Sequence, residues 1–409
     1  MGASPSVSSP APYALPYVGL VALAVAIFLS VTLEMLPLGL LPQMSAELGV
    51  SESLIGISVT VYALTVVLST AVLTAITRRI ARHTLVVAVL AVFAVSAFLS
   101  AAAPSYELLI ASRVLGGLAH GLFWSIVGAY AAYLVPREHV GRAVSITLGG
   151  TSLALVMGVP LATALGTALG WRLSFAVLAA LTLAGVVVVL VFLPTVGRAD
   201  TAPGSAPTLG SSAEPPVIGV IVLCVVTALI MVGQYSFYTY FAPFYTREVG
   251  VPGSQISGAL FVYGAVGAVS LVIVALWLGR RPRASLYAVL SLLLVAIVLL
   301  ASLPGLLPVA VVATVLWALS IGAVQPLLQT RMLHSTSERT RDTASAFFTT
   351  AFNIGIGGGA LVGAVALDEL GIGSLAWIYA AILAAGIVLV IGSDIVVGRV
   401  SEARRPRRP

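Results

Sequence analysis

The chain has no lysine, because all 20 of its basic residues are arginine. A P-loop requires a lysine on the nucleotide phosphates and a retinal pump requires a lysine for its Schiff base, so the chain alone can be neither. Its one cysteine, Cys224, excludes an internal disulfide. No cluster of cysteine and histidine occurs at ligand spacing, so the sequence predicts no metal centre and no cofactor.

Charged residues are also scarce, at 8% of the 409 residues, whereas 60% are apolar without counting 39 glycines. Soluble domains average about 25% charged residues, so this composition indicates a membrane protein. A membrane span takes about 20 apolar residues, and the apolar total covers about twelve spans with little left for a soluble domain. Since no nucleophile, base and orienting group occur together at a plausible spacing, we expect no enzyme activity.

Twelve apolar runs are bounded by clusters of proline, glycine and arginine, and each is expected to be a helix because a helix satisfies its own backbone in lipid. The runs are 17–39, 53–76, 84–103, 107–134, 143–165, 172–193, 217–241, 255–278, 285–303, 307–330, 343–366 and 373–397. The predicted fold is an all-α membrane protein with two pseudo-symmetric six-helix bundles. The predicted domains are a tail at 1–16, bundles at 17–193 and 217–397, a linker at 194–216 and a basic tail at 398–409.

Arginines are distributed unevenly between the loops on the two sides of the predicted spans. With the N-terminus in the cytoplasm, the inner loops and the C-terminal tail hold seventeen arginines and the outer loops hold two. This excess follows the positive-inside rule and predicts that both termini face the cytoplasm, with the protein in the inner (plasma) membrane. The terminal "RRPRRP" is then interpreted as an orientation signal that contacts lipid or solvent, and not as a nucleic-acid site.

The two halves of the chain match without a gap at a shift of 201 residues. "SAELGVS" at 45–51 falls on "TREVGVP" at 246–252, and "VLGGLAHG" at 114–121 falls on "VLWALSIG" at 315–322. Several matches at one offset indicate a duplicated six-helix unit. Parallel repeats of this kind place a substrate site between the halves near the middle of the membrane, and they work by rocking one half against the other.

One carboxylate, Glu34, lies inside the first apolar run, in "SVTLEMLPLGLLP". A charge near the bilayer centre costs about 2.5–3.5 kcal/mol on insertion scales, so such a residue usually faces a cavity or a partner. One interpretation is structural: the carboxylate reaches the outer interface or caps the helix break at Pro37. The other is functional: Glu34 takes up and releases a proton as the cavity changes side. At the 201-residue shift Glu34 falls on Tyr235, so the second half lacks this charge.

A second group of polar residues lies in "ASRVLGGLAHGLFW". Arg113, Gly117, His120 and Trp124 are spaced four, three and four apart, so they share one helical face. The stripe carries a fixed cation, a titrating group and an aromatic surface that could line a cavity. The structural alternatives remain open: an ion pair or backbone carbonyls for Arg113, a core histidine for His120 and ordinary packing for Trp124.

Further polar side chains within the runs are candidates for the substrate cavity, or for hydrogen bonds between helices. These are Gln234, Tyr235, Tyr238, Gln325, Gln329 and Asn353. Their amide and phenol groups suit an uncharged or mildly polar organic substrate. Two glycine patterns have another interpretation: Gly355, Gly359 and Gly363 form a stripe for close helix contact, and Gly150, Gly158 and Pro160 lie in the fifth run, where they permit close packing or a bend.

These segments together resemble the major facilitator superfamily, in its branch of twelve-helix drug:proton antiporters that includes arabinose-efflux-like and chloramphenicol-resistance exporters. The resemblance rests on "LEMLPLGLLPQMSAELGVS", "RVLGGLAHGLFW", "GRAVSITLGGTSLALVMGVPLATALGTALGWR" and "TASAFFTTAFNIGIGGGALVG". It implies Arg113 and Glu34 as proton-coupling residues, and Gly150, Gly158 and Pro160 as the antiporter motif. The stripe adds His120, a titrating group on the face of Arg113, to the expected proton-coupling residues.

The loop "TAITRRIARHTL" departs from the gating motif of that family. Arg79 and Arg82 fit, but Thr74 and Arg78 stand where the motif has glycine and aspartate. We therefore expect Asp342 or Glu338 to pair with the cluster of Arg78, Arg79 and Arg82 as a cytoplasmic gate.

The resemblance implies a secondary transporter that exports a small organic compound, such as a drug or related metabolite, in exchange for protons. Its expected partners are this substrate, protons and the bilayer, and the expected working unit is a monomer. A sugar or metabolite transporter, by symport or facilitated diffusion, and a non-transporting receptor are the alternatives.

Overall fold

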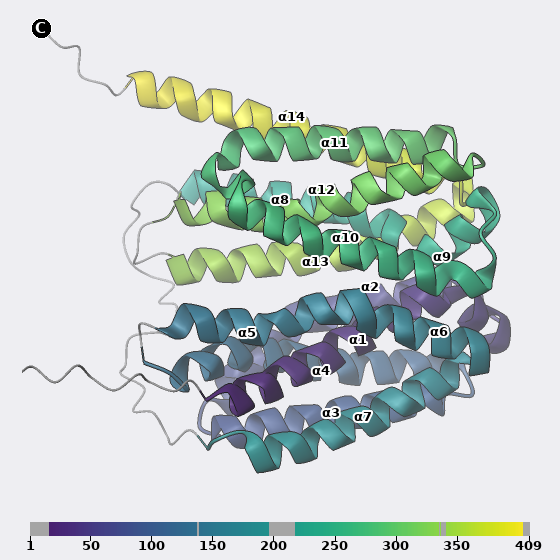
Figure 1. Ribbon diagram of the computed structural model, residues 1–409, viewed down its shortest axis with the longest axis vertical. Helices are drawn as coiled ribbons and strands as arrows, with labels where there is room; N and C mark the ends of the chain where they lie inside the picture. Colours follow the sequence, from purple (N-terminus) through teal and green to yellow (C-terminus); the bar gives the residue numbers. More distant parts are fainter. Residues whose placement is uncertain (1–15, 137–138, 196–216, 335, 337–340, 404–409) are drawn as a thin grey trace, which may run out of the picture.

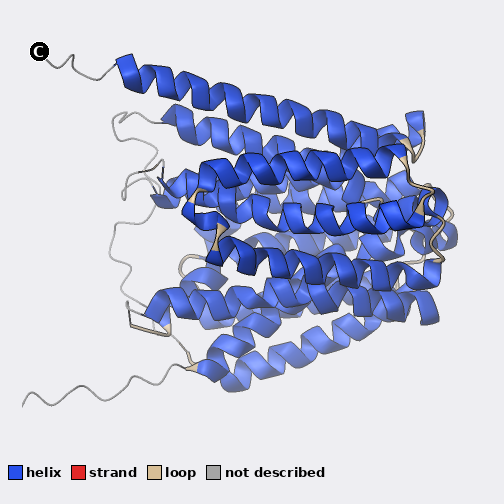
Figure 2. Cartoon of the chain, turned by 45° about the horizontal axis from the view of Figure 1, so that its top comes forward, coloured by secondary structure: helices blue, strands red, loops and turns tan. Residues whose placement is uncertain are grey.

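The computed structural model describes residues 16–136, 139–195, 217–334, 336 and 341–403. Within these ranges every regular element is a helix (Figure 2). In the described part of the chain, twelve helices are long and apolar enough to cross a membrane. This confirms the predicted all-α fold with twelve spans, and the chain is a multi-pass membrane protein.

The spans follow the apolar runs closely. The first six are α1 (Tyr17–Leu48), α2 (Glu52–Thr77), α3 (Arg82–Ala101), α4 (Tyr106–Tyr133), the continuous α5 (Val140–Leu153), η2 (Ala154–Gly158) and α6 (Val159–Leu169), and α7 (Trp171–Phe192). The others are α8 (Val217–Tyr238), with the short α9 (Phe241–Phe244) and η3 (Tyr245–Val249), then η4 (Gly253–Gln255) with α10 (Ile256–Leu276), η5 (Leu278–Arg280) with α11 (Pro282–Ser302), α12 (Leu307–His334), α13 (Arg341–Leu370) and α14 (Ser374–Ala403).

Two helices extend beyond one end of their apolar runs by more than four residues. The predicted first run ends at residue 39, but α1 continues to Leu48 and ends where Gly49 adopts a left-handed conformation with φ 65°. Glycine is suited to this position because it has no Cβ to oppose a positive φ. Similarly, α14 continues to Ala403, past the predicted end at 397. Both extensions contain polar residues, which hydropathy alone does not assign to a span.

The internal repeat is visible in the helix bounds. Shifting α4, Tyr106–Tyr133, by 201 residues gives the bounds of α12, Leu307–His334. The same shift carries the segment from Val140 to Leu169 onto α13, Arg341–Leu370. Helices α1–α7 occupy the lower part of Figure 1 and α8–α14 the upper part, and α1 begins and α14 ends at the same, left-hand end.

The two halves meet along α2 and α13, mainly in the part of these helices away from the termini. On the facing side of α2, Gly56 and Ala63 are buried, whereas Ala71 and Thr74, further along the same face, are exposed. On α13, Gly357 and Ala364 are buried, and Ala346 and Thr350 on the same face are exposed. The halves therefore pack together at one end and part at the end where α1 begins and α14 ends.

Glycine permits the closest contact within the second half. The stripe predicted from the sequence packs α13 on α8, and a Cβ on Gly359 would lie 2.6 Å from the Val232 carbonyl oxygen and 2.8 Å from Tyr235 Cβ. A Cβ on Gly149 of α5 would meet nothing within 4 Å.

A Gly359→Ala variant is therefore expected to unfold at a lower temperature, by a loss of roughly 1–3 kcal/mol from overpacking. Gly149→Ala is the control, because it fills empty space and restricts the unfolded chain, so its stability should be unchanged or higher. Thermal unfolding of the detergent-purified proteins measures both. Equal stability of the two variants would show that the stripe is not a tight contact.

Candidate functional site

The site begins with a break in the hydrogen-bonding pattern of α1. Pro37 has no N–H, so it cannot donate to the carbonyl of Leu33 four residues earlier. Arg113 of α4 takes this place: its Nη1 donates to the Leu33 carbonyl over 3.1 Å and its Nη2 to the Glu34 carbonyl over 3.0 Å. The planar guanidinium supplies both donors at once. Of the roles left open for Arg113, the structure shows binding to backbone carbonyls.

Glu34 is held beside this contact, in the interior of the protein. Only 6% of the residue is exposed, and its Oε2 lies 3.5 Å from Nε2 of His120, which is 4% exposed. The other ring nitrogen of His120, Nδ1, lies 3.1 Å from the hydroxyl of Ser30. The carboxylate therefore does not reach the outer interface. Glu34, His120 and Ser30 form one buried polar chain that joins α1 to α4.

Aromatic rings surround the imidazole and the guanidinium. The Arg113 guanidinium lies over the ring of Tyr62 at 4.2 Å, a cation–π contact. Tyr62 also meets His120 edge-on, with 5.4 Å between ring centroids, and Trp124 contacts the imidazole at 5.9 Å. Phe93 of α3 completes this shell around His120. The rings limit the access of water, so the charges in the cluster interact more strongly than in solution.

The second half contributes Tyr235 of α8, which is half-buried and lies near Glu34. Glu34 is therefore close to the boundary between the halves. Tyr238, one turn further on, is buried and stacks on Tyr263 of α10 with 5.0 Å between ring centroids. Of the two tyrosines, Tyr235 is the more exposed.

Gln234 has a different position from the one expected of a cavity residue. Its Oε1 accepts hydrogen bonds of 2.8 Å from Trp317 Nε1 and from the Tyr379 hydroxyl, and its Nε2 donates to Tyr263 over 2.9 Å. The residue is 4% exposed. All these bonds lie within the second half, where they join α8, α10, α12 and α14. The geometry matches the alternative left open for such residues, a hydrogen bond between helices.

The remaining polar candidates are more exposed than Gln234. Gln325 and Gln329 of α12 are exposed and lie four residues apart, so they share one face of the helix. Asn353 of α13 is half-buried and donates to the Thr349 carbonyl over 2.9 Å. By the 201-residue shift Gln325 is the counterpart of Trp124, which is half-buried in the first half.

The antiporter-motif residues pack the fifth span on α1. A Cβ on Gly150 would meet the carbonyl oxygen of Ala24, and a Cβ on Gly158 would meet the Thr32 hydroxyl and lie 3.0 Å from the ring of Phe28. Pro160, buried at the start of α6, has no N–H for the carbonyl four residues earlier, and the preceding turn is the wide π-helix η2. The opposite side of η2 meets α10, where Gly264 lies against Leu155.

The predicted cytoplasmic gate lies at the end where the halves part. Arg78 and Arg79 are exposed, and Arg82 lies over the Tyr133 ring of its own half at 4.6 Å. Glu338 and the side chain of Asp342 lie outside the described residues, so their pairing with this cluster stays a prediction.

Sequence reasoning missed several members of the cluster. Tyr62 and Ser30 are ordinary residues in apolar helices, and nothing in their own spacing marks them. Pro37 could have indicated the contact, because it leaves the Leu33 carbonyl without a helical donor. In lipid that carbonyl requires a donor from another group. The match of that carbonyl to Arg113, however, depends on how α1 and α4 pack.

A family model described as Major Facilitator Superfamily matches residues 23–360 and 223–408, which is most of the chain. The chain belongs to this superfamily. A chloramphenicol efflux pump of Mycobacterium tuberculosis is 35% identical over 357 residues, 85% of each chain. A probable sugar efflux transporter of Mannheimia succiniciproducens is 28% identical over 375 residues, 92% of this chain and 93% of its own length.

Solved structures of transporters share the fold. A human organic anion transporter superposes with a TM-score of 0.68 at 17% identity, over 94% of this chain and 100% of that one. A bacterial homologue of the human lysosomal transporter Spinster gives a TM-score of 0.70 at 15% identity, over 93% and 96% of the two chains. As a member of the superfamily, the protein is a membrane transporter, and the cluster around Glu34 belongs to a transport fold.

The Arg113 contact predicts a non-additive pair of variants. Arg113→Met removes two charge-assisted donors to α1 and is expected to lower stability by about 1.5–3 kcal/mol. Pro37→Ala returns an N–H to the Leu33 carbonyl, so Arg113→Met should cost less in that background. Thermal unfolding of the single and double variants gives the coupling. An equal loss in both backgrounds would mean that Arg113 does not replace the missing donor.

The Gln234 network predicts a loss of stability on removal of its amide. Gln234→Leu leaves Trp317, Tyr379 and Tyr263 without a shared partner and should cost about 1–3 kcal/mol for each group left unpaired. Gln325→Leu is the matched control, because that side chain is exposed. Thermal unfolding again distinguishes them, and equal stability of the two variants would contradict a structural role for Gln234.

Proposed function

We propose that the protein is a proton-coupled antiporter that exports a small organic compound through the inner (plasma) membrane by alternating access. In this proposal both termini are cytoplasmic, as the excess of arginine in the inner loops favours. The observation that carries the proposal is the buried cluster of Glu34, His120 and Arg113, at the middle of α1 and beside Tyr235 of the other half.

The cluster has the chemistry that a proton-coupling site needs. A buried carboxylate is costly when charged, so Glu34 can hold a proton in one conformation and release it when water or a substrate changes its surroundings. His120 offers a second acceptor 3.5 Å away. Arg113 keeps its charge throughout the cycle. The number of protons on Glu34 and His120 then sets the net charge facing the substrate.

The conformation is one that an exporter needs for loading. The halves part at the end where α1 begins and α14 ends, and in the proposed orientation this end faces the cytoplasm. An exporter must load its substrate from that side. The contact between α2 and α13 closes the opposite side in this conformation.

One proton is energetically sufficient for such a pump. A membrane potential of about 100 mV contributes about 2.3 kcal/mol per charge. One pH unit contributes about 1.4 kcal/mol more. Together they sustain a solute gradient of several hundredfold, so a single carboxylate can couple the two fluxes.

The proposed substrate is an uncharged or mildly polar compound, because Tyr235, Gln325 and Asn353 are at least partly exposed and offer phenol and amide groups. The relative named as a chloramphenicol efflux pump makes chloramphenicol the first compound to test. Transport of a sugar is the second candidate, favoured by the relative named as a probable sugar efflux transporter. Amide and phenol groups also suit the hydroxyls of a sugar.

Glu34→Gln tests the coupling, because glutamine keeps the size and cannot titrate. Proteoliposomes with an imposed proton gradient should concentrate chloramphenicol or a sugar with the wild type, and the gradient-driven component should fall at least tenfold in Glu34→Gln. Counterflow without a proton gradient should persist, since it needs only the change of side. Glu369→Gln, at an exposed position of α13, is the control. Concentration of substrate by Glu34→Gln against its gradient would exclude Glu34 from the mechanism.

A further inference from the structure

We propose that the start of α2 and two elements of the second half form an ionic latch, composed of Glu52, Ser53, Arg247 and Asp368, which sets the balance between the two conformations of the transporter. The inference rests on alternating access as proposed above. It concerns the end of the protein opposite the termini, away from the Glu34 cluster.

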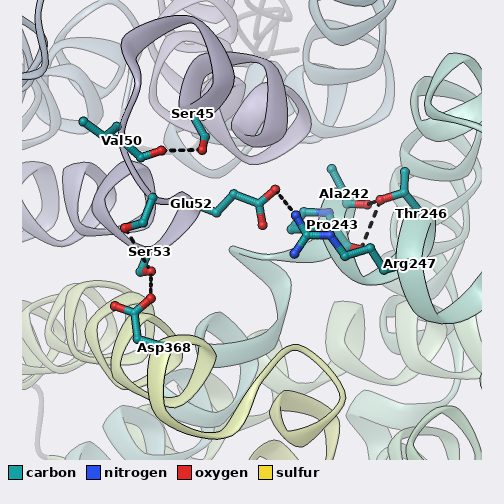
Figure 3. Close-up of polar contacts among 10 residues, drawn as sticks. Ser45, Val50, Glu52, Ser53, Ala242, Pro243, Thr246, Arg247 and Asp368 are labelled. Carbon is teal, nitrogen blue, oxygen red and sulfur yellow. Dashed lines mark hydrogen bonds and ion pairs between the residues drawn. The ribbon is translucent and has the colours of Figure 1, made fainter.

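The first contact of the latch is an ion pair between the halves. Nη2 of Arg247, on η3, lies 2.6 Å from Oε1 of Glu52 in the first turn of α2 (Figure 3). The Glu52 side chain is only 10% exposed, whereas that of Arg247 is 53% exposed. A carboxylate buried to this extent depends on its cation, because removal of one partner leaves an unpaired charge.

The second contact is a hydrogen bond from the next residue of α2. The hydroxyl of Ser53 donates to Oδ1 of Asp368, near the end of α13 (Figure 3). Consecutive residues of one helix therefore bind two different elements of the second half, η3 and α13. A movement that separates the halves at this end has to break both contacts.

Below the latch the halves meet through uncharged groups. Gly56 lies against the Tyr240 hydroxyl, and the Thr60 hydroxyl donates to the Gly357 carbonyl over 2.9 Å. Glycine at position 56 lets the ring of the other half approach the backbone of α2. The latch is thus the charged end of a close seam, about five helical turns from the exposed Ala71 of α2 and Thr350 of α13.

The latch is suited to bias an equilibrium rather than to lock it. A polar pocket of about 320 Å³ borders the pair, lined by Ser45, Ser51 and Leu367 as well as by the four latch residues. Water in this pocket can solvate the charges when they separate. An interaction that changes the conformational ratio by a factor of about 5 to 30 corresponds to about 1–2 kcal/mol. Two conformations of one protein typically differ by a few kcal/mol, so a change of this size is enough to shift their populations.

The charged residues of the latch are not repeated at the pseudo-symmetric positions of the chain. At the 201-residue shift, Arg247 falls on Ala46, Glu52 on Gly253 and Asp368 on Thr167. The first half has an ion pair of its own at the same end, Arg172 with Glu47, and it joins α7 to α1 inside that half. This pair is a matched control, because it has the same charges at the same end without crossing between the halves.

Pulsed electron paramagnetic resonance tests the latch directly. In a Cys224→Ser background, spin labels on Val72→Cys and Phe347→Cys, both exposed near the gap, report its width. Glu52→Gln and Arg247→Gln should each move the ratio of wide to narrow distances at least fivefold toward narrow. Glu47→Gln and Arg172→Gln should leave the ratio within twofold of the unmodified protein.

Restoration of the pair separates the latch from general damage. Arg247→Lys keeps a cation and should retain most of the wide population, and the exchange Glu52→Arg with Arg247→Glu should return the ratio toward the starting value. Unchanged ratios in the single variants, or equal shifts in the Glu47→Gln control, would overturn the latch. The distances are measured without substrate or proton gradient, so they test the latch independently of transport. If the ratio shifts as expected but transport assays show no antiport, the proposed function is wrong and the latch stands.

Discussion

The contact between Arg113 and the backbone of α1 is the constraint on which the centre of the protein depends. Pro37 removes a donor from the middle of a transmembrane helix, where no water is available to replace it. The Arg113 guanidinium donates to the Leu33 carbonyl, which Pro37 leaves without a helical donor, and to the next carbonyl, that of Glu34. A permanent positive charge is thereby fixed beside Glu34. The same arginine thus repairs a helix and shapes the electrostatics of the site.

The packing around α1 connects this centre to the rest of the fold. Gly150 and Gly158 bring the fifth span against one side of α1, and α4 brings His120 against another. The π-helix between these glycines touches α10 of the second half. A displacement of the second half can therefore reach α1 through directly packed helices. In the proposed cycle the carboxylate of Glu34 and the position of the halves change together.

The fold could be predicted from the sequence in most respects. Hydropathy predicted the twelve spans. The 201-residue offset predicted the internal repeat, and the bounds of α4 and α12 coincide at that offset. Polar helix ends, such as the stretch from residue 40 to Leu48, were missed because an apolar run stops before the helix does. The superfamily followed from motifs, and the family model confirms it.

The site was only partly predictable. Helical spacing placed Arg113, His120 and Trp124 on one face, and they do share a cluster with Glu34. Spacing cannot tell that Arg113 binds carbonyls or that Gln234 is enclosed by three aromatic residues, since both facts depend on neighbouring helices. The latch was also out of reach, because the two residues of each contact lie 195 and 315 residues apart and come from different halves.

Proton release on substrate binding is the most direct test of the central claim that the buried carboxylate exchanges its proton in response to the transported compound. Purified protein in weakly buffered detergent solution can be mixed with substrate while a pH indicator records the medium. The account predicts release of about one proton per bound substrate near neutral pH, and none from Glu34→Gln with binding preserved. Equal release from both proteins, or binding without release from the unmodified protein, would contradict it.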